Sequence, residues 1–202
     1  METPEEGRVV ALRRAAEKAV ALTVLSGGDS VDLTISTSLW ERVGAPQIGD
    51  RIGVTLLSEL KHASDYRLAC RAALRILENG DNNARTLRDK LRRKGISREI
   101  AEEAVEKMVA LGYIREGEQA RRLAAGYARR NLWGPRRIVS ALLAKGYSKT
   151  DADAAVREIA DAGEIVFASV RATLIARCRA RGMEPEKIRA TLYRYGFRSE
   201  DE

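Results

Sequence analysis

The sequence predicts a mainly α-helical protein, in which tandem three-helix repeats form an elongated curved array after a small N-terminal module with a β-hairpin. Two observations carry this prediction. A phrase with two apolar residues four positions apart, and a glycine four positions later, occurs three times and ends at Gly95, Gly146 and Gly196, at intervals of 51 and 50 residues. The composition also favours helix, because Ala, Leu, Arg and Glu dominate and aromatic residues make up only 5%.

The N-terminal module is predicted to span residues 1–56. A hairpin is expected over residues 20–36, because two β-branched segments flank the turn-forming cluster at residues 26–30. The stretch from Val9 to Val20 leaves two interpretations open, a frayed helix and the approach to a strand. A short helix capped by Ser38 is expected to complete the module.

Three repeats are predicted to follow, over residues 57–114, 115–165 and 166–202. In each repeat, apolar residues fall on a rotating helical stripe, and glycine or proline separates the helices. Pro135 and Pro185 are expected at the first position of a helix, where the missing N–H of proline is harmless. Few residues follow the last repeated phrase, so the third repeat is expected to be truncated.

The glycine of the repeated phrase is interpreted as a structural cap. Helices commonly end in a left-handed residue, which glycine adopts without a Cβ clash, and the next apolar residue packs back on the last turn. Ile96, Tyr147 and Phe197 occupy that apolar position. The phrase is also similar to the turn of a DNA-reading helix-turn-helix motif. The helices that follow it are acidic and would repel phosphates, so the structural interpretation is favoured.

The charge distribution points to the repeats as the functional part. Residues 1–64 hold 7 Lys and Arg against 9 Asp and Glu, whereas residues 65–202 hold 29 against 20. Stacked repeats would align these cations along one surface suited to phosphates, and a solvated face partly paired with nearby acids is the alternative. The candidate DNA- or filament-binding residues are Arg88, Arg92, Arg93, Lys94, Arg129, Arg130, Arg136, Arg137, Lys145, Arg177 and Arg194.

No catalytic, metal or cofactor site is predicted. No nucleophile or carboxylate is suggested near His62, and Cys70 and Cys178 lack metal-ligand spacing. Trp133 is expected to pack at a helix junction rather than stack on a base. No apolar run approaches the roughly 18 to 20 residues that span a bilayer. We therefore expect a cytoplasmic, monomeric protein that is not an enzyme.

The three phrases, in this order and spacing, resemble the RecX family of regulators of the bacterial RecA recombinase. The resemblance covers about residues 66–198 and is strongest in the middle repeat, where Gly134-Pro-Arg-Arg precedes the phrase. The segment 79–83 and Glu118 depart from the usual family pattern.

This resemblance implies a non-enzymatic regulator that binds the filament of recombinase on single-stranded DNA. It implies that the regulator lies in the helical groove of the filament and limits ATP hydrolysis, strand exchange and the co-protease activity behind the SOS response. Double-stranded DNA is left open as a second nucleic-acid partner. The alternative is a stand-alone nucleic-acid-binding helical-repeat protein without a recombinase partner.

Overall fold

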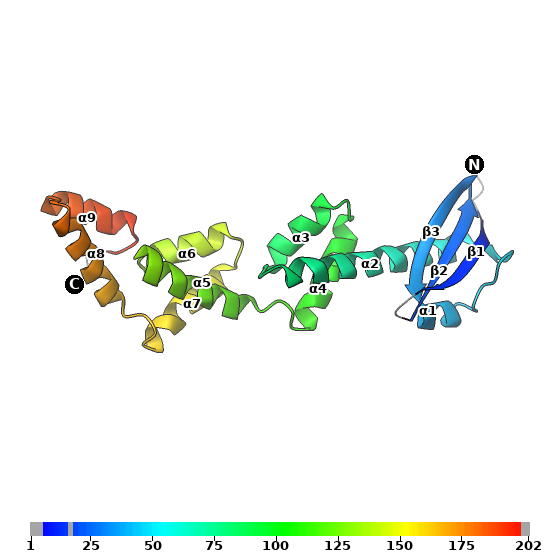
Figure 1. The fold of residues 1–202 in the computed structure, drawn as a ribbon, viewed down its shortest axis with the longest axis horizontal. Helices are drawn as coiled ribbons and strands as arrows, with labels where there is room; N and C mark the ends of the chain where they lie inside the picture. Colours follow the sequence, from blue (N-terminus) through cyan, green and yellow to red (C-terminus); the bar gives the residue numbers. More distant parts are fainter. Residues whose placement is uncertain (1–5, 16–17, 199–202) are drawn as a thin grey trace. The chain divides into compact units, whose positions relative to one another are not determined.

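The computed structural model describes residues 6–15 and 18–198, which form two compact units (Figure 1). Unit 1 combines the chain up to Glu78 with Arg88–Met108, and unit 2 combines Asn79–Leu87 with the chain from Val109 onward. Helices dominate, and a small antiparallel sheet precedes them. The predicted fold class, three-helix repeats after a β-containing module, is confirmed.

Unit 1 begins with a four-stranded antiparallel sheet in the order β3-β2-β1-β4. Its strands are β1 (Gly7–Ala15), β2 (Ala19–Ser26), β3 (Asp29–Ser36) and β4 (Arg51–Ile52). The predicted hairpin is confirmed as β2 and β3, which pair along their whole length. The stretch left open between helix and strand is largely β1, which pairs with β2. Its composition of Ala, Leu and Arg suits a helix equally well, so only the pairing decides.

Helix α1 (Thr37–Arg42) begins earlier than predicted. Its N-cap is Ser36, whose Oγ accepts a hydrogen bond from the Leu39 N–H at 3.1 Å, so the prediction of Ser38 as the cap is wrong. Ser36 is the last residue of β3 and is still extended, which is the backbone geometry that an N-cap requires. One serine therefore ends the strand and starts the helix.

Helix α2 (Val54–Glu78) runs from the sheet into the helical part of unit 1 (Figure 1). Leu57 and Leu60, near its start, join the buried core formed by the sheet and α1. Further along, the Ser64 Oγ accepts a hydrogen bond from the Thr34 N–H of β3 at 2.9 Å. The other helices that contribute to unit 1 are α3 (Ala84–Arg93) and α4 (Arg98–Ala110).

Unit 2 contains the later repeats. Its helices are α5 (Glu116–Asn131), α6 (Pro135–Ala144), α7 (Lys149–Asp161), α8 (Phe167–Ala180) and α9 (Pro185–Arg194). Alanines on α5, including Ala120 and Ala124, pack in one buried cluster with Ile138 and Leu142 of α6 and with Ile159 of α7. Small side chains allow close helix packing around these branched residues. Both prolines open their helices, as predicted.

Each repeated glycine ends a helix in the left-handed conformation, as predicted. The φ angles of Gly95, Gly146 and Gly196 are 84°, 93° and 90°. The N–H of the residue after each glycine donates to the carbonyl five positions earlier, which defines a Schellman motif. These bonds run from Ile96 to Leu91, from Tyr147 to Leu142 and from Phe197 to Leu192, at 3.3, 3.1 and 3.1 Å.

The start of α6 contacts the glycine turn that ends α9. The Gly134 N–H donates to the Tyr195 carbonyl at 2.7 Å, and the Arg136 N–H donates to the Gly196 carbonyl at 3.3 Å. No side chain caps α6, so these carbonyls satisfy N–H groups that the helix leaves unpaired. A Cβ atom on Gly134 would lie 2.8 Å from the Gly196 backbone. We call this contact the Gly196 joint.

A related contact, the Gly146 joint, links the start of α3 to the turn that ends α6. The Asn83 Oδ1 accepts a hydrogen bond from the Thr86 N–H at 2.8 Å, so Asn83 is the N-cap of α3. The Asn83 Nδ2 donates to the Lys145 carbonyl at 2.9 Å. The side chain of Arg85 lies over Gly146, where a Cβ atom would come within 2.6 Å of the Arg85 Cδ.

Replacing Asn83 with alanine is expected to destabilise the chain by about 2 kcal/mol, because one buried amide both caps α3 and holds the Gly146 joint. Ser148→Ala is the matched control. It removes a helix cap, the hydrogen bond from the Asp151 N–H at 3.0 Å, together with the exposed bond that the Ser148 hydroxyl donates to the Asp151 carboxylate at 2.6 Å, and should cost about 1 kcal/mol. Urea denaturation followed by circular dichroism measures both values. Equal losses would show that the bond to Lys145 contributes nothing.

Candidate nucleic-acid interface

The candidate basic residues lie in both units. In unit 1, Arg88, Arg92 and Arg93 lie on α3, and Lys94 follows the end of that helix. The members in unit 2 are Arg129 and Arg130 on α5, Arg136 and Arg137 on α6, Lys145 at the end of α6, Arg177 on α8 and Arg194 on α9. Their alignment along one continuous surface stays a prediction.

Two of the four candidates in unit 1 border an open hollow of about 700 Å³ beside the Gly95 turn. Arg92 and Arg93 line it and are exposed. Arg88 is half-buried, and its Nε lies 3.9 Å from the Glu102 carboxylate, which therefore offsets part of its charge. Of the candidates on α3, Arg92 and Arg93 are the cations best placed to meet an external anion.

Acidic residues compensate part of the charge on α5. The Glu164 carboxylate pairs with Arg121 at 3.0 Å and with Arg129 at 3.1 Å. Arg122 pairs with Asp81 at 2.6 Å. All three arginines remain at least 46% exposed, and exposed ion pairs contribute roughly 1 kcal/mol or less. A phosphate group could therefore compete for Arg129 at low cost.

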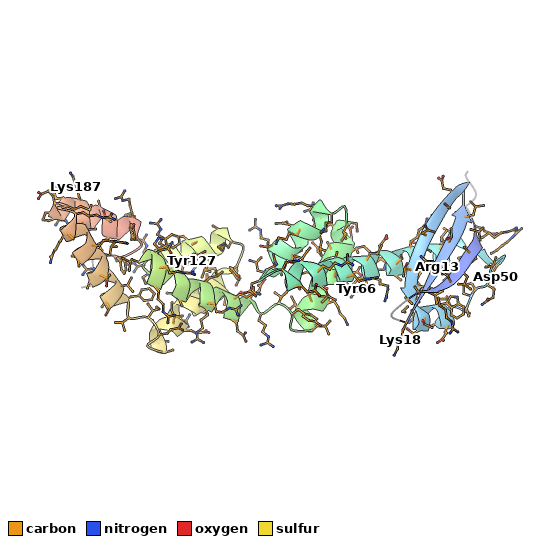
Figure 2. The ribbon with its side chains drawn as sticks, in the orientation of Figure 1. Arg13, Lys18, Asp50, Tyr66, Tyr127 and Lys187 are labelled. Atoms are coloured by element: carbon orange, nitrogen blue, oxygen red, sulfur yellow. The ribbon has the colours of Figure 1, made fainter. Side chains whose placement is uncertain are left out.

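Arg137 has a packing role in the Gly196 joint. Its guanidinium lies 4.4 Å from the ring centroid of Trp133 and 5.1 Å from that of Tyr195, and its Nη1 donates to the Arg194 carbonyl at 3.0 Å. Trp133 in turn contacts Tyr127, with ring centroids 4.7 Å apart. Tyr127 lies on α5 (Figure 2). Trp133 thus packs at a helix junction, as expected, and binding a ligand through Arg137 would disturb the joint.

An exposed arginine and an exposed tyrosine meet at the same joint. The Arg136 guanidinium lies 5.3 Å from the ring centroid of Tyr193, which is 66% exposed. Arg194 is the next residue on α9 and is also exposed. We call Arg136, Tyr193 and Arg194 the joint patch. Tyr193 was not among the candidate binding residues predicted from the sequence. Its position in the third repeated phrase is the one that Arg92, a candidate, occupies in the first.

The joint patch has the chemistry of a single-strand binding surface. Guanidinium groups donate forked hydrogen bonds to phosphate oxygens. An exposed aromatic ring next to cations offers a face on which a base can stack, whatever its sequence. Because Tyr193 stays exposed while Trp133 and Tyr195 are half-buried, it is the ring of this joint that a base can reach.

Two groups of titratable side chains lie in unit 1, away from the basic candidates. The expectation that no carboxylate lies near His62 is wrong, because its Nε2 lies 3.1 Å from the Glu103 Oε1, although both side chains are about half exposed. Tyr66 lies on α2 (Figure 2). Burial raises the pKa of Tyr66 to about 12 and also raises the pKa of the neighbouring Cys70 thiol. A thiol that stays protonated at neutral pH is a poor nucleophile.

Residues 6–15 and 18–198 contain no group of three or more His, Cys, Asp or Glu side chains that could hold a metal ion. No helix in the same ranges is both long enough and apolar enough to cross a bilayer.

Fold and surface together define a helical-repeat protein with arginine-rich exposed faces. Comparison with related sequences identifies its family. The chain is 30% identical over 138 residues to the regulatory protein RecX of Trichlorobacter lovleyi, which covers 64% of this chain and 87% of that protein. The regulatory protein RecX of Listeria monocytogenes serovar 1/2a is 26% identical over 147 residues, or 71% of this chain and 55% of its own. The chain therefore belongs to the RecX family.

The Listeria relative is considerably longer than the aligned segment, since this chain spans about half of it. A scan against models of protein families gives no match. The crystal structure of a regulatory protein RecX has a TM-score of 0.74 at 17% identity, covering 96% of this chain and 95% of its own. The crystal structure of RecX from Lactobacillus salivarius has a TM-score of 0.61 at 23% identity, and the match covers 68% of this chain and 92% of the other. Both share the helical-repeat fold.

Proposed function

We propose that this chain regulates a RecA recombinase by binding the filament that the recombinase forms on single-stranded DNA. The observation that carries the contact with DNA is the joint patch, where Arg136 and Arg194 flank the exposed ring of Tyr193. Membership in the RecX family supports the recombinase as the protein partner. The chain acts by binding and not by catalysis.

The regulator inhibits, and it does so from the helical groove of the filament. Opposite charges on unit 2 suit a contact with two kinds of surface. The joint patch is cationic, whereas α7 exposes Glu158 and Asp161. Like-charge repulsion directs the acidic helix away from phosphates and toward basic protein surface. Bound in this way, the chain limits ATP hydrolysis, strand exchange and co-protease activity together.

Titration of the chain into recombinase filaments on single-stranded DNA, with ATP hydrolysis as the readout, tests this proposal. Hydrolysis should fall as the chain is added, and the inhibition should weaken as salt rises, because phosphate contacts release counterions. Hydrolysis that stays constant at saturating protein would exclude an inhibitor. DNA affinity that is identical with and without recombinase would favour a stand-alone nucleic-acid-binding protein.

A further inference from the structure

A pocket in unit 1 lies beside α1, at the end of the sheet where β1 leads into β2, and the proposed function does not use it. Its volume of about 450 Å³ falls within the range of about 300 to 1,000 Å³ that small-ligand sites occupy. Two structural elements far from the repeats build it, the sheet and the short helix. The polar and aromatic residues that line it are Arg13, Arg14, Lys18, Thr37, Trp40 and Glu41.

The pocket is cationic, although the segment around it is not. Residues 1–64 hold 7 Lys and Arg against 9 Asp and Glu. Three of these cations, Arg13, Arg14 and Lys18, line the pocket together with one acid, Glu41, which leaves a surplus of two positive charges. All three cations are exposed, and none forms an ion pair with a carboxylate of the described residues. The pocket therefore attracts an external anion.

An unusual backbone conformation holds Lys18 at the wall of the pocket. Its φ of 55° is left-handed, which costs free energy in a residue that carries a Cβ atom. The Lys18 carbonyl accepts a hydrogen bond at 2.9 Å from the Thr37 N–H, which the first turn of α1 leaves without an intrahelical partner. Residues held in this region recur at ligand-binding sites. The bond anchors Lys18 beside the helix that supplies Trp40.

Trp40 gives the pocket an aromatic wall. Its side chain is half-buried against the core of the sheet, and its Nε1 donates to the Pro46 carbonyl at 3.3 Å. This bond occupies the only polar group of the indole, so the surface that lines the pocket is apolar. Cations beside an aromatic ring are the combination with which proteins bind single-stranded nucleic acid. An acidic peptide would use the cations but leave the ring without a partner.

We propose that this pocket is a second binding site for single-stranded nucleic acid, in unit 1, whereas the joint patch lies in unit 2. The cations Arg13, Arg14 and Lys18 bind phosphate, and a neighbouring base packs on the ring of Trp40. Binding of this kind does not depend on sequence, because it reads no base edge. The site needs no recombinase, so this proposal and the proposed function can each fail while the other stands.

Tryptophan fluorescence of the full chain tests the site. The chain has two tryptophans, so Trp133→Phe leaves Trp40 as the reporter. Oligothymidylate at low salt should quench its emission saturably, because a base stacks on the ring. Arg13→Gln with Arg14→Gln and Lys18→Asn should raise the dissociation constant about tenfold, since phosphate contacts are lost. Asparagine is chosen at position 18 because it tolerates the left-handed conformation.

The matched control removes the same charge from exposed residues of unit 1 that do not line the pocket, by Arg8→Gln with Arg42→Gln and Arg51→Gln. It should bind like the parent protein with Trp133→Phe. A control that loses as much affinity as the pocket variant overturns the proposal, because net charge alone then governs binding. Emission of Trp40 that stays constant at saturating oligothymidylate also overturns it. Circular dichroism should show that both variants keep the parent fold.

Three further measurements identify what the pocket binds. Thymidine monophosphate that quenches with the affinity of the oligonucleotide would assign the pocket to free nucleotides and overturn the proposal. Polyglutamate that quenches equally would assign it to acidic protein and overturn it as well. The quenching should persist when Arg136 and Arg194 are replaced by glutamate. Its complete loss in that variant would show that unit 1 has no site of its own.

Discussion

Replacing Gly196 with alanine is expected to lower the free energy of unfolding by about 3 kcal/mol or more. Two costs add at this position. The φ of 90° strains any residue that carries a Cβ atom. The new Cβ would also collide with the backbone N–H of Arg137 and lie 3.1 Å from its Cα. A backbone atom cannot rotate away, so the Gly196 joint has to open.

The other two repeated glycines provide matched controls for this substitution. Gly95→Ala should cost only the left-handed strain of about 1 to 2 kcal/mol, because no atom of the described residues lies within 4 Å of the new atom. Gly146→Ala should fall between, since the atom in its way is the flexible side chain of Arg85. Urea denaturation of the three variants gives the order. Equal losses would show that the joints do not stabilise unit 2.

The helices and their glycine caps could be predicted because both depend on local sequence. The stripe of apolar residues sets a helix within one repeat, and the turn at Gly146 is completed by bonds to residues only a few positions away. The joints could not be predicted in this way. Gly134 was expected only to precede a helix, yet it also contacts a turn that lies 62 residues later in the chain.

Contacts between distant elements explain the other differences. The stretch around β1 could be assigned only by its pairing with β2. His62 acquires a carboxylate neighbour because α2 and α4 bring it beside Glu103. For the candidate site, the sequence places arginines on α6 and α9 among other helices, but spacing cannot show which guanidinium is exposed. Arg136 lies over an exposed ring, while Arg137 is held between two half-buried rings.

Replacing both Arg136 and Arg194 with glutamate is expected to weaken binding of single-stranded DNA about tenfold, which is about 1.4 kcal/mol, because two phosphate contacts become repulsive. The slope of log affinity against log salt should also fall by about 1.4, since each lost contact accounts for roughly 0.7 on a single strand. Fluorescence anisotropy of a labelled oligonucleotide at several salt concentrations measures both quantities. Arg71→Glu with Arg157→Glu is the control, because both residues are exposed and lie outside the joint patch.

Tyr193→Ala separates stacking from charge at the same patch. Loss of one base–aromatic stack costs roughly 1 to 3 kcal/mol, and it releases no counterions. The variant should therefore bind more weakly with an unchanged salt slope, whereas the arginine variant changes both. If Tyr193→Ala binds like the wild type while the arginine variant is impaired, the patch contacts phosphates alone. The control variant, with Arg71 and Arg157 replaced by glutamate, should keep its affinity, because a local contact depends on where the charge lies. If it loses as much affinity as the Arg136 and Arg194 variant, net charge governs binding and the joint patch has no special role.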